Sequence, residues 1–189
     1  RSGGVRIGDY VAVFGQGPIG LCATLGAHLR GAARVFAIDT NPFRLEVARR
    51  LGATDTILAS DAPLDAILAA THHHGVDVAI EAIGIQDTFS NALAVVKPGG
   101  TLSSVGVYSR SISVDVLSFG EGLAEKTITT SLCPGGKERM LRLMRLVESK
   151  RIDLTPLLTH HFTLDNIAEA YNLFSLQHDN VLKVAVHVR

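Results

Sequence analysis

At 189 residues, the chain has room for one domain with a sizeable buried core, or for one domain with a short extension. Hydrophobic residues make up 47% of the sequence and charged residues 19%, which is typical of a folded protein and argues against a disordered one. The formal net charge is zero, so the composition gives no support to nucleic acid or an anionic membrane as a partner.

The two cysteines, Cys22 and Cys133, are far apart, so they indicate neither a disulfide framework nor a zinc-binding spacing. No apolar run approaches the roughly 20 residues that a membrane-spanning helix needs. We therefore expect a cytoplasmic protein. The chain opens at Arg1 without Met, and its first expected strand begins almost at once, which suggests a piece of a longer protein.

Short β-branched runs alternate with helical patterns along the first two thirds of the chain. Strands are predicted at 10–15, 34–39, 55–59, 75–84, 101–109 and 128–132. Helices are predicted between them at 19–30, 40–53, 63–70 and 86–96. This alternation predicts an α/β fold, a doubly wound parallel six-stranded Rossmann sheet with helices on both faces.

The remaining residues form a second predicted segment. Its predicted elements are helices at 137–150 and 164–176 and a last strand at 181–188. The glycine-rich "CPGGK" at 133–137 is the best candidate boundary, so we divide the chain into a Rossmann domain, 1–133, and a carboxy-terminal extension, 134–189. His160 and His161 fit either a polar connection into the second helix or a position facing an active cleft.

The run "YVAVFG" leads into a glycine-rich turn, in which Gly15, Gly17 and Gly20 form G-x-G-x-x-G. Because the turn follows a buried strand and opens a helix, it predicts a binding site for a dinucleotide pyrophosphate. Gly15 permits the tight turn, Gly17 lets the backbone approach the pyrophosphate, and Gly20 lets helix and strand pack closely. The helix start at Pro18 and Ile19 directs free N–H groups and the positive end of the helix dipole toward the phosphates.

An acidic residue follows at the spacing that this motif requires. Asp39 ends the second predicted strand, 19 residues after Gly20, close to the roughly 20 expected of a ribose-binding acid. Its carboxylate can accept hydrogen bonds from both adenosine ribose hydroxyls and would repel a 2′-phosphate, so we expect NAD rather than NADP. Arg44, on the next helix, is placed to cover the adenosine or to stabilise Asp39, whereas Arg49 and Arg50 fit a solvated helix face.

Two further features were weighed as sites. Three consecutive histidines, His72 to His74, point in different directions in either a helix or a strand, so we interpret them as loop surface rather than as metal ligands. Glu81, near the end of the fourth predicted strand, fits either a ligand contact or a loop cap, and the sequence leaves both readings open.

Nearly the whole chain resembles the coenzyme domain of the medium-chain, zinc-dependent alcohol dehydrogenases. The resemblance is carried by "VAVFGQGPIGLCATLGAHLRGAARVFAIDTNPFRLEVARRLGA", "GVDVAIEAIG", "VVKPGGTLSSVGV" and "KTITTSLCPGGKERMLRLMRLVESKRIDLTPLLTH". The tail is most similar to that of the bacterial secondary-alcohol dehydrogenases. Members of that branch that use NADP replace the strand-end acid with a small residue, so Asp39 again indicates NAD.

The resemblance implies that the cofactor is bound by the glycine turn, the strand-end acid and its neighbouring arginine, the loops after the fourth and fifth strands, and a basic residue of the last strand. In that order the residues are Gly15, Gly17, Pro18, Ile19 and Gly20; Asp39 and Arg44; Ala82, Ile83 and Gly84, then Val105, Gly106 and Val107; and Lys183. The loop after the fourth strand would line the cofactor crevice, the loop after the fifth would flank the nicotinamide, and the lysine would reach the pyrophosphate. Independently, sheets of this kind bind ligands at the carboxyl ends of their strands.

In this family the catalytic zinc ligands, the proton-relay hydroxyl and the structural-zinc cysteines belong to an amino-terminal domain, and no residue here matches them. Zinc there polarises the alcohol oxygen, so that a hydride can leave for the nicotinamide. We therefore expect the parent protein to be an NAD-dependent dehydrogenase of secondary alcohols or polyols. The chain itself is expected to bind the cofactor without catalytic residues or metal ligands of its own.

Two other classes of protein were considered. A zinc-free quinone or enoyl reductase relative usually carries an alanine-rich turn and favours NADPH, so "GQGPIG" and Asp39 count against it. A non-catalytic dinucleotide-binding module stays open. The family also pairs its sixth strand across a two-fold axis, and an unpaired apolar edge is a liability, so we expect a homo-oligomer, a dimer or tetramer, through Lys126 to Leu132.

Overall fold

A computed structural model describes residues 3–132 and 135–188 of the chain. The chain divides into two compact units, Arg1–Leu132 and Cys133–Arg189, and each is described below by itself. Cys133 and Pro134, where the sequence analysis draws the domain boundary, lie outside the described residues.

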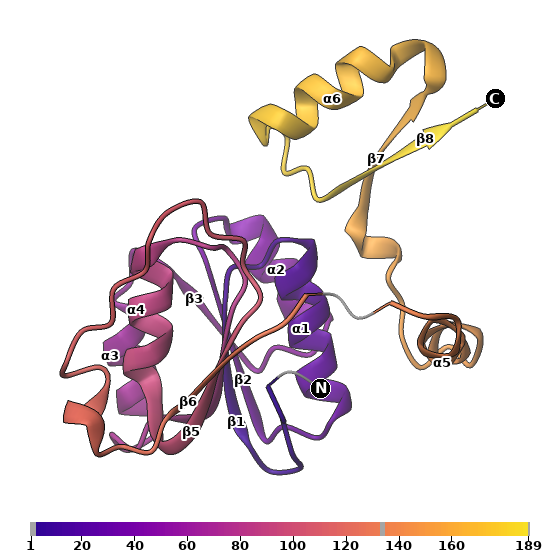
Figure 1. Ribbon diagram of the computed structural model, residues 1–189. Coiled ribbons are helices and arrows are strands. Elements are labelled where there is room, and N and C mark those ends of the chain that lie inside the picture. Colours follow the sequence, from indigo (N-terminus) through magenta and orange to yellow (C-terminus); the bar gives the residue numbers. More distant parts are fainter. Residues whose placement is uncertain (1–2, 133–134, 189) are drawn as a thin grey trace. The chain divides into compact units, whose positions relative to one another are not determined.

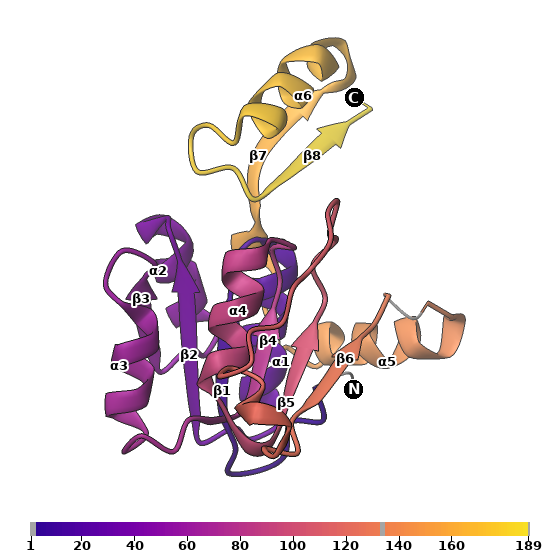
Figure 2. The same ribbon diagram turned by 60° about the vertical axis from the view of Figure 1, so that its left-hand side comes forward.

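The first unit is built on a six-stranded parallel sheet in the order β3-β2-β1-β4-β5-β6, seen across its width in Figure 2. In chain order the strands are β1 (Tyr10–Phe14), β2 (Arg34–Asp39), β3 (Asp55–Leu58), β4 (Val76–Glu81), β5 (Val96–Ser104) and β6 (Thr127–Thr130). The chain builds outward from β1 to β3 and then returns to the other side of β1 with β4. This order confirms the predicted doubly wound Rossmann sheet.

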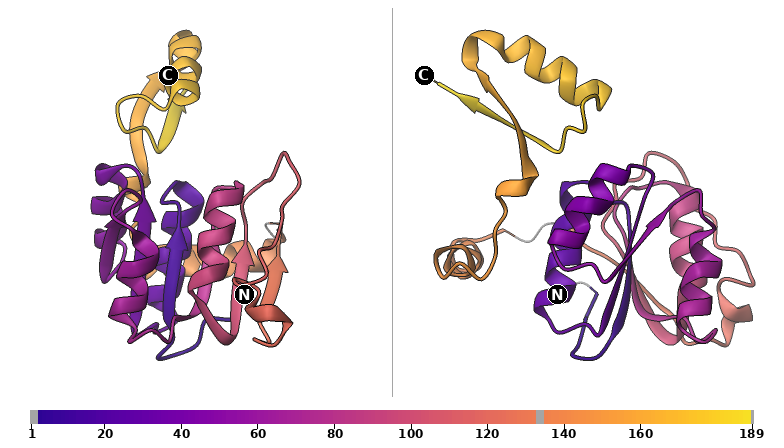
Figure 3. Two further views of the ribbon diagram at one scale, coloured as in Figure 1. Left: turned by 90° about the vertical axis from the view of Figure 1, so that its left-hand side faces the viewer. Right: turned by 180° about the vertical axis from the view of Figure 1, so that it is seen from behind.

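Helices cover both faces of this sheet (Figures 1 and 3). The first face carries α1 (Pro18–Leu29) and α2 (Pro42–Arg50), and the second carries α3 (Pro63–Ala70) and α4 (Gln86–Val95). Side chains of β1 alternate between the two cores: Val11 and Val13 pack on the side of α1, and Phe14 packs against Phe89 of α4. Because both faces are buried, the strand is a nearly continuous apolar run.

The start of α2 follows the sequence signal closely. Asn41 has an extended backbone, and its side-chain oxygen accepts a hydrogen bond from the Phe43 N–H at 2.9 Å. Pro42 occupies the first helical position, where its missing N–H costs no hydrogen bond. Asn41 therefore caps α2, and the cap fixes the direction in which the chain leaves Asp39.

The fifth strand differs from its prediction at both ends. Residues 97–100, which precede the strand predicted at 101–109, belong to β5, and a shift in pairing between Val76 and Val78 of β4 accommodates them. Gly100 makes this possible, because a Cβ there would lie 2.9 Å from the Asp77 carbonyl oxygen. The strand then ends at Ser104, and the N–H of Val105 turns to the Glu81 carbonyl at 2.8 Å.

The second unit contains α5 (Lys137–Glu148), β7 (Leu158–Thr163), α6 (Ile167–Leu176) and β8 (Lys183–His187). Strands β7 and β8 pair in parallel and are connected through α6. His160 and His161 lie within β7, so the expected polar connection is wrong there, while a position facing an active cleft stays a prediction. The apolar positions of β7, Leu158 and Phe162, are interrupted by polar ones, which hides the strand from a search for β-branched runs.

Candidate cofactor-binding site

Two of the three glycines in the turn after β1 are needed for the turn to fold. Gly15 has a φ of +88°, and a Cβ there would lie 2.4 Å from the Ile83 side chain. A Cβ on Gly20 would lie 1.7 Å from the Gly15 carbonyl oxygen, so only glycine lets α1 approach the turn this closely. The turn and the start of α1 are thus packed as tightly as the backbone allows.

Gly17 is different, because the protein itself does not require a glycine there. Its φ of −67° is open to any residue, and a Cβ would meet nothing within 4 Å. Gly17 precedes α1 at a helix start where, among the described residues, no side chain caps the helix and no acid lies in the first turn. The turn is therefore open on the side where the helix presents its N–H groups, which fits a pyrophosphate.

Asp39 lies next to this turn. It ends β2 and is only 6% exposed, and its Oδ2 accepts a hydrogen bond from the Gln16 N–H at 2.6 Å. Its Oδ1 accepts one from the Asn41 N–H at 2.8 Å. These bonds fix the carboxylate beside the glycine turn, and each oxygen keeps a lone pair for a ribose hydroxyl.

Gln16 is a residue that sequence reasoning missed. Its side chain is completely buried; Nε2 donates to the Val13 carbonyl at 2.9 Å, and Oε1 accepts from the Thr24 hydroxyl of α1 at 2.9 Å. The amide therefore holds the turn between β1 and α1. The sequence does contain a signal for this role: Gln16 is a long polar residue in an otherwise apolar strand and turn, and Thr24 is the single hydroxyl residue of the helix that follows.

The loops after β4 and β5 meet at the carboxyl ends of their strands. A Cβ on Gly84 would lie 2.3 Å from the Val107 carbonyl oxygen, and a Cβ on Gly106 would lie 2.3 Å from the Gly84 N. Through Ile83, the first loop also reaches Gly15 of the glycine turn. The structure therefore brings Ala82, Ile83, Gly84 and residues 105–107 together beside the turn, where the strand order reverses between β1 and β4.

Glu81, which the sequence leaves open between two roles, caps the loop after β4. It is completely buried, and its Oε1 accepts hydrogen bonds from the N–H groups of Ile83 and Gly84, each at 2.8 Å. Tyr108 donates its hydroxyl proton to Oε2 of Glu81 at 2.6 Å. Burial and this bond to Glu81 raise the pKa of Tyr108 well above its ordinary value, so the phenol stays protonated and remains a donor.

A cavity of about 420 Å³ opens next to these loops. It is lined by Gly84, Ile85, Gln86 and Asp87 of the loop after β4 and the start of α4, and by residues 108–112. Gln86 connects its two walls, since its side-chain amide donates to the Ser113 carbonyl and accepts from the Ser113 N–H, both at 2.8 Å. The amide thus holds the segment after Tyr108 against α4.

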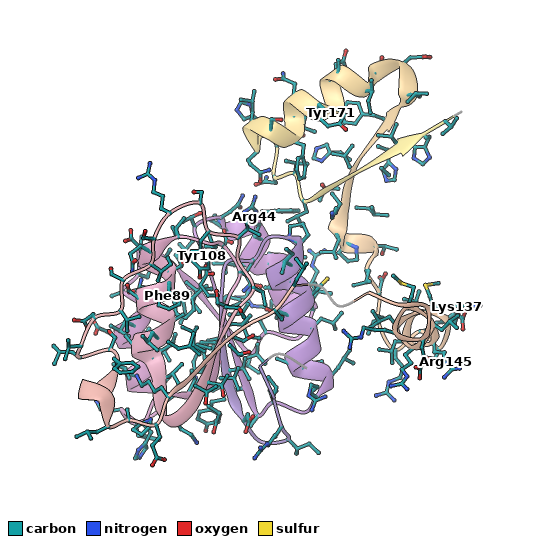
Figure 4. All side chains as sticks on the ribbon, viewed as in Figure 1. Arg44, Phe89, Tyr108, Lys137, Arg145 and Tyr171 are labelled. Carbon is teal, nitrogen blue, oxygen red and sulfur yellow. The ribbon has the colours of Figure 1, made fainter. Side chains whose placement is uncertain are left out.

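The two predicted basic residues lie in different units. Arg44 lies in the first turn of α2, close to the carboxyl ends of the strands (Figure 4). Lys183 begins β8 in the second unit and lines a cavity of about 260 Å³ with Tyr171 and Phe174 of α6. Its contact with a pyrophosphate stays a prediction.

Comparison with known families assigns the chain. A family profile described as zinc-binding dehydrogenase matches residues 18–149, which is more than half of the sequence. The chain belongs to the zinc-binding dehydrogenase family. Its first unit is the NAD(P)-binding domain of that family, as the resemblance implies.

Individual zinc-binding dehydrogenases support the assignment. An alcohol dehydrogenase of Cupriavidus necator is 53% identical over 184 residues, which cover 96% of this chain and 50% of that protein. The NADP-dependent isopropanol dehydrogenase of Thermoanaerobacter brockii is 41% identical, over 96% of this chain and 53% of that protein. The chain thus spans about half the length of the curated relatives that it matches.

Solved structures agree on the fold. The zinc-dependent alcohol dehydrogenase 2 of Streptococcus pneumonia is 34% identical with a TM-score of 0.90, over 98% of this chain and 53% of that one. The alcohol dehydrogenase TADH of Thermus sp. ATN1, also 34% identical, has a TM-score of 0.85 over 99% of this chain and 53% of that one.

The family name implies a zinc ion, but the residues that the structure describes do not form a site that would hold it. Among these described residues, no three His, Cys, Asp or Glu side chains come together as a metal site. His72 to His74 lie exposed at the turn after α3, where His72 and His73 have positive φ values. In the described part of the chain, no helix is long and apolar enough to cross a membrane.

Proposed function

We propose that this chain is the NAD(H)-binding part of a zinc-type alcohol dehydrogenase that transfers a hydride between a secondary alcohol or polyol and NAD. The observation that carries the proposal is the buried Asp39 carboxylate, bonded to the Gln16 N–H beside an open glycine turn. NAD supplies the hydride acceptor when it is bound. The residues of this chain bind and orient it: the glycine turn holds the pyrophosphate and Asp39 the adenosine ribose. The loop after β4 lines the cofactor crevice, and the loop after β5 flanks the nicotinamide.

The preference for NAD over NADP is the finer part of the proposal. The relatives in Thermoanaerobacter brockii and Clostridium beijerinckii are named as NADP-dependent, so family membership alone does not select the cofactor. A carboxylate at the ribose repels the 2′-phosphate of NADP and accepts from the two hydroxyls of NAD. Because Asp39 is buried and held by two backbone N–H groups, it cannot turn away from the ribose.

The experiment is a fluorescence titration of the chain with NADH and with NADPH. The unmodified chain should bind NADH more tightly than NADPH. Asp39→Ala should weaken NADH binding about tenfold or more, because the hydrogen bonds from the ribose to a charged acceptor are lost. The difference between the affinities for NADH and NADPH should become smaller. Glu46→Ala, which removes an exposed carboxylate from α2, is the control and should leave both affinities unchanged. Tighter binding of NADPH by the unmodified chain would sink the assignment.

Three parts of the proposal concern the protein beyond the site. We expect the chain by itself to bind cofactor without oxidising 2-propanol, since no described residue matches the catalytic ligands of the family. The exposed edge of β6 supports a homo-oligomer through Lys126 to Leu132, because β6 is the last strand of the sheet and Ile128 on it is 39% exposed. A cytoplasmic site of action rests on composition alone.

A further inference from the structure

We propose that Glu81 is a positioning residue for the nicotinamide half of the cofactor: it holds the loops after β4 and β5 in register with each other. This inference rests on the proposed function, since it concerns the same crevice. Glu81 itself touches no ligand, because its side chain is completely buried among protein groups. It acts through the two loops that the cofactor would meet.

The first loop is bonded to one oxygen of the carboxylate. Oε1 of Glu81 accepts the N–H groups of Ile83 and Gly84, and also the hydroxyl of Thr88 in α4, each at 2.8 Å. Gly84 has a φ of +96° and is therefore a point at which the backbone reverses. The carboxylate closes this reversal and joins it to the first turn of α4.

The second loop is bonded to the same residue through other atoms. The Glu81 carbonyl accepts the N–H of Val105 at 2.8 Å and that of Gly106 at 3.1 Å. Its Oε2 accepts the hydroxyl of Tyr108 at 2.6 Å. The stretch that would flank the nicotinamide, 105–107, is thus held at both ends by Glu81.

Tyr108 extends this connection to the body of the domain. Its hydroxyl also lies 2.7 Å from the Ser104 Oγ at the end of β5. Its ring meets Phe89 of α4 edge-on, with 6.1 Å between ring centroids and 84° between planes, and the two residues are neighbours in Figure 4. The tyrosine is therefore fixed by packing as well as by hydrogen bonds.

The two loops pass close to the Glu81 carboxylate and to each other. A Cβ on Gly106 would lie 2.5 Å from Oε2 of Glu81, which shows how closely the backbone of the second loop passes the carboxylate. If the carboxylate is removed, the partly buried N–H groups of Ile83 and Gly84 and the hydroxyls of Thr88 and Tyr108 lose their acceptor, and the loops shift to reach water or another partner. Such a shift changes the crevice at the nicotinamide end and leaves the ribose acid, Asp39, in place.

The test compares two ligands that share the adenosine half. Affinities of the full 189-residue chain for NADH and for ADP-ribose, which lacks the nicotinamide, are measured for the unmodified protein, Glu81→Ala, Glu81→Gln and Tyr108→Phe. Glu81→Ala should weaken NADH binding about tenfold and ADP-ribose binding less than about twofold. Glu81→Gln should recover most of the loss, because its amide oxygen still accepts from the first loop and its amide nitrogen can donate to Tyr108.

Tyr108→Phe serves if the alanine variant does not fold, since it removes one hydroxyl and retains the ring against Phe89. It should weaken NADH binding and leave ADP-ribose binding unchanged. Equal losses for both ligands in folded variants, or no loss for either, would overturn the inference while leaving the proposed function intact. Failure of the unmodified chain to bind NADH would instead overturn the proposed function.

Discussion

At the scale of single residues, the buried Gln16 amide has a predictable energetic role. Gln16→Leu would leave the Thr24 hydroxyl and the Val13 carbonyl buried without their partner, which should lower the free energy of unfolding by about 2 kcal/mol. Urea denaturation of the chain measures this. The double variant with Thr24→Val should lose no more stability than the single one, because the stranded hydroxyl is gone; a purely additive loss would contradict this account.

The residue scale also shows what a sequence can and cannot predict about the site. Gly15, Gly20 and Asp39 were found from spacing, because the turn needs them at fixed distances along the chain. Gln16 and Tyr108 were not, because their roles depend on partners in other elements: Gln16 bonds to α1, and Tyr108 to β4. A motif states which residues are close in sequence, and a buried hydrogen bond across elements leaves no such local pattern.

At the scale of elements, the edge strand β3 is held to β2 by an ion pair. Arg34 Nε donates to Asp55 Oδ2 at 2.8 Å, and Arg34 Nη2 donates to Asp55 Oδ1 at 2.7 Å. The hydrogen bond from Arg34 holds the pKa of Asp55 below its ordinary value. A carboxyl with a lowered folded pKa stabilises the protein above its unfolded pKa of roughly 3.9 and loses that contribution as the pH falls through the folded value.

Asp55→Asn should therefore lower the free energy of unfolding at pH 7 by up to about 1 kcal/mol, since the pair is partly exposed. At a pH below the unfolded pKa of roughly 3.9, the difference in stability between the variant and the unmodified chain should shrink as the pH falls, because Asp55 becomes protonated in the unmodified chain. Thermal unfolding at the two pH values tests both statements. The control, Asp61→Asn, changes an exposed aspartate that accepts from the neighbouring Ser60 hydroxyl; an equal effect there would contradict a specific role for the pair.

Element prediction succeeded where one physical signal dominated. The strands β1, β2 and β4 are buried on both faces, so each has a largely apolar sequence. The start of α2 is marked by Asn41 as its cap and Pro42 as its first residue. The start of β5 was misplaced because "KPGG" is a typical turn sequence, yet its glycines here admit a close backbone neighbour inside the strand. Strand β7 was missed because polar residues interrupt its apolar positions. Its histidines have contacts far along the chain instead: the ring of His161 stacks on that of His187, with ring centroids 5.2 Å apart.

At the scale of the whole molecule, the free edge of β6 gives a test of assembly. If two chains join along β6, Ile128→Asp should disrupt the dimer, because it places a carboxylate in the joined edge in place of the half-exposed isoleucine. Sedimentation equilibrium of both proteins measures the change. Ile7→Asp alters an isoleucine that is 89% exposed elsewhere and should leave assembly unaffected. An unmodified chain that stays monomeric would contradict the proposed oligomer.

Within one short turn, the open space at Gly17 distinguishes a glycine needed for ligand binding from the two glycines, Gly15 and Gly20, that are needed for folding. Substitution at Gly15 or Gly20 collides with the protein's own atoms, so folding alone preserves those glycines. A Cβ at position 17 would meet no protein atom within 4 Å, so the fold itself does not require glycine there, whereas a bound pyrophosphate does. In a descendant that had stopped binding dinucleotides, position 17 would be free to drift while 15 and 20 stayed fixed. The residue at position 17 can therefore distinguish domains that bind a dinucleotide from domains of the same fold that have lost this binding.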